Sequence, residues 1–282
     1  MSIGDFHCHS SRSDGTRSPS QVVDLAAARG VRVLALTDHD TLDGLPEARE
    51  AASRHAGMML IPGVELSCDV PGTEVHMLGL FVDEANEHFQ SALARMRTAR
   101  LDRAERIVSA LSDLGAPIEW ARVQEIAGDA SVGRPHIARA LVEAGHVESF
   151  NAAFDSFLAR NSPAYVERMR LEPAEAIELI TDAGGLAVFA HPPFTEGYES
   201  IAAELAEAGL FGMEVYYRAF PPEQVASLHT LAEQLGLVSL GGSDYHGLER
   251  PDEREPGDIP LPDEAVDTVL AAARARGCAV PV

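Results

Sequence analysis

At residues 31–40 the chain reads VRVLALTDHD, an almost continuously apolar run followed at once by acidic and imidazole side chains. Such a run is typical of a strand that is buried on both faces of a parallel sheet. An amphipathic, helix-length stretch at 18–29 precedes it, and a strand-like run at 3–9 comes before that helix. The order of strand, helix and strand predicts parallel strands joined by helical crossovers.

The same alternation continues along the chain. Further strand-like runs lie at 58–66, 75–82, 186–191, 211–217 and 237–244. Helix-length stretches lie at 173–183, 199–208, 223–235 and 263–276. Seven strands with interleaved helices predict an α/β fold, a (β/α) barrel rather than an open sheet. Residues 86–170 show helix after helix and no strand-like run. We therefore expect a helical insertion there and a barrel domain built from residues 1–85 and 171–282.

Charge and composition exclude several classes of protein. The 282 residues include 22 basic and 44 acidic side chains, a net charge of −22. Binding of duplex nucleic acid is therefore not expected, because it needs a basic surface, whereas bound cations can still make a pocket attractive to a small anion. The arginines between Arg95 and Arg106 are interrupted by acids and are interpreted as a solvated helix face. Three unpaired cysteines and the lack of a signal segment or a long apolar run predict a cytoplasmic protein without membrane spans.

Candidate metal ligands begin near the N-terminus, in DFHCHSSRSDG at residues 5–15. In an extended segment His7 and His9 share one face, while Cys8 points to the other. Asp14 follows shortly after them. Paired imidazoles with a nearby carboxylate are typical metal ligands, although a single histidine taken alone is more often an ordinary core or surface residue.

Further candidates come directly after or within the later strand-like runs. They are Asp38 and His39 in TDHD, Glu65 in PGVELS, His76 in VHMLG, His191 in FAHP, and Asp244 and His246 in GGSDYH. Six residues should lie at or just past the carboxyl ends of strands, which form the catalytic face of a (β/α) barrel, namely His9, His39, Glu65, His76, His191 and Asp244. A buried carboxylate beside an imidazole is costly unless a metal ion or a hydrogen bond satisfies it. The repetition at five separate places indicates one shared metal site.

Taken in order, the motifs HxH, SDG, TDHD, PGxE, HxLG, AHP and GSDxH resemble the polymerase and histidinol phosphatase (PHP) family of metallophosphoesterases. The resemblance covers about residues 5–246 and implies a distorted seven-stranded barrel that holds two or three divalent ions. It implies ligands His7, His9, Glu65 and Asp244 for the first ion, and Asp14, His39 and His246 for the second. A third ion would be held by Glu65, His76 and His191. Manganese, iron and zinc all suit these nitrogen and oxygen donors.

Within that family, the segment SVGRPHIARAL at 131–141 resembles a subgroup that removes the 3′-phosphate of nucleoside 3′,5′-bisphosphates and trims short RNAs from the 5′ end. The expected partners are thus small nucleotides or short single-stranded oligonucleotides. The helical insertion is expected to cover the catalytic face. Arg134 is a candidate hydrogen-bond donor to a phosphate group. The alternative is that Arg134 only begins a helix and pairs with a local acid. His136, Arg12 and Arg17 are further candidate substrate-binding residues.

His191 and Asp38 are candidate catalytic residues. His191 would protonate the leaving alkoxide if no third ion is bound. One rival function is that of a histidinol-phosphate phosphatase, against which the long insertion argues. Another is a metal-dependent amidohydrolase; such sites often use a bridging lysine, and the chain contains no lysine. A non-catalytic metal-binding module is the third rival, and the complete set of nine ligands argues against it.

Overall fold

Seven strands form one sheet in the computed structural model, which describes residues 1–70, 72–167, 171–218, 220–248 and 253–281. The strands follow one another in chain order across the sheet. They are β1 (Gly4–Asp5), β2 (Val33–Leu36), β3 (Met59–Val70), β4 (Thr73–Leu80), β5 (Leu186–Ala190), β6 (Gly212–Tyr217) and β7 (Val238–Gly242). The amide of Phe6 donates to the carbonyl of Gly241 at 3.2 Å, which brings the first and last strands together. The predicted seven-stranded barrel is confirmed, and it is nearly closed.

Strand direction departs from the parallel order that the sequence predicts. β4 runs antiparallel to both β3 and β5, whereas the other neighbouring pairs are parallel. A two-residue connection between β3 and β4 leaves no room for a helical crossover, so a hairpin is the only short solution. The expectation that His76 ends a strand is therefore wrong, and so is the same expectation for Glu65, which lies in the middle of the long strand β3. His76 lies in the first half of β4 and reaches the same face of the barrel because that strand is reversed.

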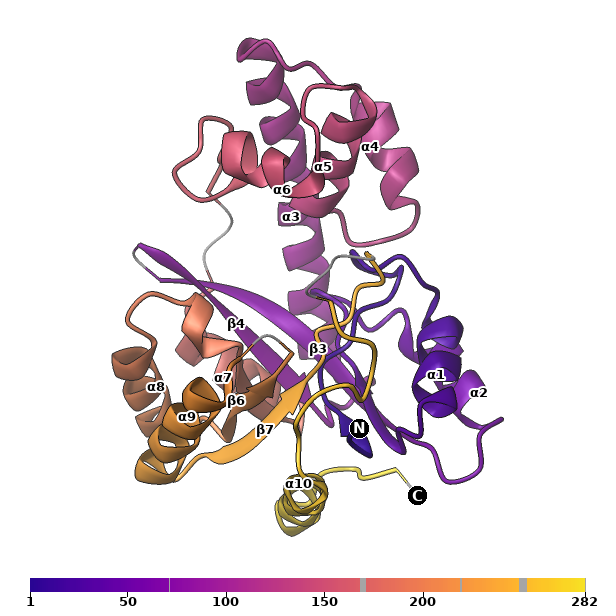
Figure 1. Cartoon of the computed structure of the whole chain (residues 1–282), viewed down its shortest axis with the longest axis vertical. Helices are drawn as coiled ribbons and strands as arrows, with labels where there is room; N and C mark the ends of the chain where they lie inside the picture. The colour runs from indigo at the N-terminus through magenta and orange to yellow at the C-terminus, as the bar shows by residue number, and fades with distance from the viewer. Residues whose placement is uncertain (71, 168–170, 219, 249–252, 282) are drawn as a thin grey trace.

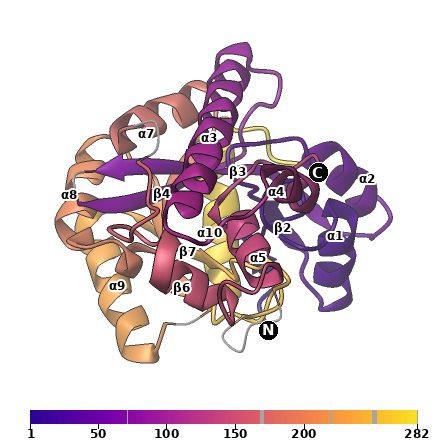
Figure 2. The same cartoon turned by 90° about the horizontal axis from the view of Figure 1, so that it is seen from above.

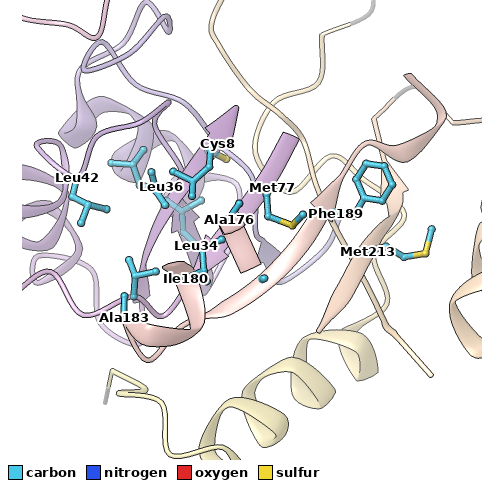
Figure 3. Close-up of a cluster of buried hydrophobic side chains, with 14 of the residues drawn as sticks. Cys8, Leu34, Leu36, Leu42, Met77, Ala176, Ile180, Ala183, Phe189 and Met213 are labelled. Carbon is cyan, nitrogen blue, oxygen red and sulfur yellow. The ribbon is translucent and has the colours of Figure 1, made fainter. Parts of the chain in front are cut away.

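Alternate residues of the strands divide the apolar core into two clusters. Inside the barrel, Val33, Leu78 and Val188 pack with Val266 and Leu270 of the last helix, which lies at the end opposite the insertion (Figure 1). The outer faces of the strands pack against the surrounding helices, where Leu34, Leu36, Cys8, Met77 and Phe189 meet Ala176 and Ile180 (Figure 3). The nearly continuous apolar character of runs such as VRVLAL follows from this burial on both faces.

Helices cover the barrel on both flanks, as Figure 2 shows. In the barrel part they are α1 (Pro19–Ala28), α2 (Leu45–Ala52), α7 (Pro173–Asp182), the 3₁₀ turn η2 (Pro192–Phe194), α8 (Tyr198–Glu207), α9 (Pro222–Leu235) and α10 (Asp263–Ala275). Ser18 caps α1 in the reciprocal arrangement with Gln21 that fixes a helix start. The helix α2 was not predicted from the sequence; it spans eight residues, of which four are buried. None of the described helices combines the length and apolar character needed to span a membrane.

The helices between β4 and α7 gather at one end of the molecule (Figure 1). They are α3 (Glu87–Asp113), α4 (Trp120–Ala127), α5 (Arg134–Glu143), α6 (Phe150–Ala153) and the π-helical turn η1 (Phe154–Leu158). They bury an apolar cluster of their own, which includes Ile107, Leu111 and Leu141. The interpretation of the α3 arginines as a solvated face is partly wrong, because Arg103 is buried against Tyr165 and Val166 and Arg100 is mostly buried against Asp40 of the barrel part.

Candidate metal centre

The first two candidate ligands follow a very short strand. β1 ends at Asp5, yet the chain stays extended, with the amide of Asp244 donating to the carbonyl of His7 and the amide of His9 to that of Tyr245. This extended backbone turns His7 and His9 to the same side, and their Nε2 atoms lie 3.0 Å apart. Cys8 packs in the outer apolar cluster, so the predicted alternation is confirmed.

Glu65 of β3 lies at the centre of the site, and its side chain is 1% exposed. Its Oε2 lies 3.3 Å from His7 Nε2, 3.1 Å from His9 Nε2 and 3.2 Å from His39 Nδ1. Its Oε1 lies 2.8 Å from His76 Nδ1 and 3.2 Å from His191 Nε2. One carboxylate thus lies close to five imidazoles from four separate segments, and its two oxygens face different groups.

Ligand atoms within 4.8 Å of one another form three groups among the described residues. They are His7, His9, Glu65 and Asp244; His9, Asp14, His39 and His246; and His39, Glu65 and His76. These groups contain eight of the nine predicted ligands, and the ninth, His191, lies with its Nε2 3.2 Å from Glu65 Oε1. The second group contains His9 in addition to the three predicted ligands Asp14, His39 and His246. The third group contains His39 where the prediction had His191, and His191 lies next to that group, beside Glu65 Oε1.

Buried charge in this site is mutually compensated. Burial by itself would raise the pKa of Glu65, but His39, His7 and His76 outweigh it and hold that pKa well below its usual range. The pKa of Asp244 and that of Asp14 are lowered in the same way, each against the effect of burial, chiefly by His7 and by His246 respectively. Burial lowers the pKa of His39 to about 3. Burial by itself would lower the pKa of His7 and that of His9, but the surrounding carboxylates outweigh it, raising the pKa of His7 well above its usual range and that of His9 to about 10. A metal ion would have to displace these protons, because an imidazole must be neutral to bind a metal.

The donor set fits divalent metal ions. His39 Nδ1, which lies 3.2 Å from Glu65 Oε2, is buried and has no hydrogen-bond partner among the described atoms, as expected of a nitrogen in a site built around cations. A mixed set of imidazole and carboxylate donors suits zinc, iron or manganese. The backbone is also held in an uncommon conformation, with φ of 31° at His191 and 50° at Asp244. Such left-handed residues cluster at functional sites, where the surrounding structure holds them.

A pocket of about 540 Å³ opens above these ligands. Its lining residues come both from the barrel and from the insertion. Four are arginines, namely Arg100, Arg103, Arg134 and Arg218. Four are aromatic, namely Phe150, Phe154, Phe194 and Tyr217. The whole chain has a net charge of −22, yet four basic side chains gather around the candidate metal ligands in this pocket.

Of the predicted substrate-binding residues, Arg134 lines this pocket. Its Nη2 donates to Glu74 Oε2 at 2.8 Å, and its guanidinium lies over the Phe154 ring at 5.8 Å. The other three do not line it. His136 accepts from the Gly133 amide at the start of α5, Arg12 pairs with Glu47, and Arg17 donates to the Tyr245 hydroxyl. The predictions for His136, Arg12 and Arg17 are not supported, because these side chains hold the scaffold together.

Asp38 also lies outside the pocket lining. Its two oxygens accept from the Ser10 amide, the Ser10 hydroxyl and the Ser13 hydroxyl, each at 2.7 Å. The structure therefore does not support the predicted catalytic role of Asp38. Its carboxylate fixes the loop between His9 and Asp14, and burial raises its pKa.

Three residues next to the ligands were not predicted from the sequence, and all lie on β6 or directly after it. Glu214 accepts from the His191 amide at 2.7 Å and lies 3.1 Å from His7 Nδ1, so one carboxylate orients two ligands. The Tyr217 hydroxyl donates to Asp244 Oδ2 at 2.6 Å, and Arg218 Nη1 donates to the Asp244 carbonyl at 3.1 Å. The available signal was an acid inside the apolar run FGMEVYY and an arginine directly behind it.

Comparison with known proteins places the chain among phosphoesterases. A family model described as the PHP domain matches residues 5–148. The chain is 35% identical over 246 residues to a 5′-3′ exoribonuclease of Haemophilus influenzae, covering 86% of this chain and 89% of that one. It is 34% identical to a 3′,5′-nucleoside bisphosphate phosphatase of Chromobacterium violaceum, with 86% of each covered. A solved Bifidobacterium adolescentis structure, assigned to the metal-dependent phosphoesterases, matches with a TM-score of 0.85 and 36% identity over 95% of each chain.

Proposed function

The chain belongs to the PHP domain family and is a metal-dependent phosphoesterase, and from this premise we propose that it removes the 3′-phosphate of nucleoside 3′,5′-bisphosphates. The name of the Chromobacterium violaceum relative supports this choice of substrate. A small nucleotide also agrees with the size of the pocket, since ligand pockets for small molecules measure roughly 300–1,000 Å³.

The observation that carries the proposal is the position of Arg134. It stands in the pocket wall on the first turn of α5, while the ligand cluster forms another part of the same lining. A substrate with two phosphates can place one at the ligand cluster and present the other to a guanidinium, which suits phosphate geometry. Binding of the remote phosphate would orient the scissile one.

We propose that His7, His9, Glu65 and Asp244 hold one ion, and that Asp14, His39 and His246 hold a second, with His9 close to both. When bound, the ions supply a nucleophile from water near neutral pH and neutralise charge on the phosphoryl oxygens. In the hydrolysis, the water oxygen bonds to phosphorus as the bond from phosphorus to the 3′ oxygen breaks.

The protein's own groups complete this reaction. Arg218 lies beside Asp244 and lines the pocket, so we propose that it donates to a phosphoryl oxygen as charge develops there. The leaving 3′ oxygen needs a proton. We assign this proton transfer to His191 when no third ion lies between Glu65, His76 and His191.

A related activity is the stepwise removal of nucleotides from the 5′ end of short oligonucleotides, the activity that names the Haemophilus influenzae relative. It requires the same cleavage of a phosphorus–oxygen bond at a 3′ position. A single strand can reach a pocket rimmed by arginines and aromatic rings, whereas a duplex meets the long-range repulsion of a strongly acidic chain.

The test is a phosphate-release screen of the metal-loaded protein with nucleoside 3′,5′-bisphosphates, 5′-mononucleotides, histidinol phosphate and short oligonucleotides. We expect a bisphosphate to give one phosphate and a nucleoside 5′-monophosphate, with the highest kcat/KM of the set. Release of the 5′-phosphate, or a higher kcat/KM for histidinol phosphate, would contradict the proposal.

A further inference from the structure

Phe194 is an exposed aromatic ring next to a candidate metal ligand. Among the described residues, four large apolar side chains are exposed, namely Met1, Leu101, Leu114 and Phe194. Phe194 is 62% exposed and is the one of these four that lines the pocket. Phe194 therefore offers an exposed aromatic ring to a molecule bound in the pocket.

The ring is supported from behind and is therefore held in place. It packs against Tyr217 at 5.6 Å in an edge-to-face arrangement and against Phe220 at 5.9 Å, and its centre lies 5.6 Å from that of His191. Phe194 also ends the turn η2, whose first two residues are prolines. Prolines restrict the backbone, so little conformational entropy would be lost when a ligand packs on the exposed part of the ring.

Aromatic side chains also stand on the insertion side of the pocket. Phe150 and Phe154 line it, with ring centres 5.2 Å apart. Phe154 begins the π-helical turn η1, a local irregularity that is frequent at functional sites. The pocket thus combines metal ligands, guanidinium groups and flat apolar rings supplied by both the barrel and the insertion.

We infer that Phe194 stacks against the base of the nucleotide and thereby sets the preference for nucleotides over other phosphate esters. This inference rests on the proposed function and names a recognition element for it. The pocket offers cationic and metal-binding groups for an anionic end and aromatic rings for a flat apolar end, and a nucleotide has both ends. Stacking accepts every base, because each has a π-face.

The experiment compares two substrates and four variants. Adenosine 3′,5′-bisphosphate and the base-free analogue 1,4-anhydroribitol 3,5-bisphosphate present the same two phosphates, and only the first carries a base. The variants are Phe194→Ala, Phe194→Leu, Phe194→Trp and the matched control Leu114→Ala, an exposed apolar residue away from the pocket. Equilibrium binding of adenosine 5′-monophosphate and of 1,4-anhydroribitol 5-phosphate gives a readout that is independent of turnover.

We expect Phe194→Ala to lower kcat/KM and product affinity for the adenosine compounds about 10- to 100-fold, the range measured for base stacking on an aromatic ring. The base-free compounds should change less than twofold. Phe194→Leu should resemble the alanine variant, and Phe194→Trp should retain the preference. Leu114→Ala should behave as the unaltered protein.

An equal loss on both kinds of compound would overturn the inference, since Phe194 would then only support His191. No loss on either would overturn it as well. The proposed function is judged separately, by whether the unaltered protein releases the 3′-phosphate at all. If it does not, the binding comparison still decides whether Phe194 recognises a base.

Discussion

Arg100 on α3 and Asp40, the residue after His39, form an ion pair that joins the insertion to the loop carrying a candidate metal ligand. Asp40 has a left-handed backbone with φ of 54°. Arg97 donates to its carbonyl at 3.3 Å, and Arg100 also donates to the Ser67 hydroxyl at 2.8 Å. The long insertion helix thus holds the backbone next to His39 in a conformation that a free aspartate rarely adopts.

Removal of the Arg100 guanidinium should therefore destabilise the protein. The Asp40 side chain is 3% exposed, so Arg100→Ala leaves a buried carboxylate without its cation. We expect the free energy of unfolding to fall by about 2–4 kcal/mol, somewhat below the loss for a fully buried pair because Arg100 keeps 19% exposure. Chemical denaturation measures it, with Arg95→Ala on the exposed side of α3 as the control. The double variant Asp40→Ala/Arg100→Ala tests the pairing itself. If its loss of unfolding free energy equals the sum of the losses in the two single variants, the two side chains do not stabilise each other.

Glu214→Gln should weaken metal binding without unfolding the barrel. The Glu214 carboxylate orients His7 through Nδ1 and the His191 backbone through its amide, and loss of such a partner typically reduces metal affinity about 10- to 100-fold. Competition with a metal chelator measures the affinity, and circular dichroism checks the fold. Glu233→Gln, an exposed acid on α9, is the matched control. Unchanged affinity in Glu214→Gln would show that Glu214 has no orienting role.

Arg134→Ala should discriminate between substrates. If Arg134 binds the phosphate that is not cleaved, we expect a loss of about 2–4 kcal/mol of transition-state stabilisation on a 3′,5′-bisphosphate, the scale of paired charge-assisted hydrogen bonds. Activity on a simple aryl phosphate should change little. Steady-state kinetics on both compounds tests this, with Arg122→Ala on the exposed part of α4 as the control. Equal losses would place Arg134 at the scissile phosphate, and no loss would reduce it to a partner of Glu74.

Metal analysis should find two to three divalent ions per chain, and chelation should remove activity. Ions that bind the folded chain and not the unfolded chain stabilise it, so their removal should lower the melting temperature as well. His7→Ala and Asp244→Ala should lose ions and activity together. An active preparation with one ion or none, or a variant that keeps activity while losing its ions, would disprove this prediction.

The local pattern of the sequence was sufficient to name candidate metal ligands. His7 and His9 alternate with Cys8 because an extended backbone has a period of two, and this holds although β1 itself spans only two residues. His39 follows an apolar strand, and the carboxyl ends of parallel strands meet at one face of a barrel. Periodicity and position after an apolar run are local properties, so these residues could be named without coordinates. The assignment of all nine ligands to ions came from the resemblance to the PHP family, and the reversal of β4 that carries His76 to the site was not predicted.

Contacts between distant segments were decided only by the folded chain. Arg100 and Arg103 look like other helix arginines in sequence, and their burial depends on what α3 packs against. Arg12, Arg17 and His136 carry suitable chemistry, yet neighbouring groups engage them elsewhere. Phe194 and Glu214 became candidates only when the fold placed one at the rim of the pocket and the other between His7 and His191. Side-chain partners far apart in sequence depend on packing, and no local pattern records that packing.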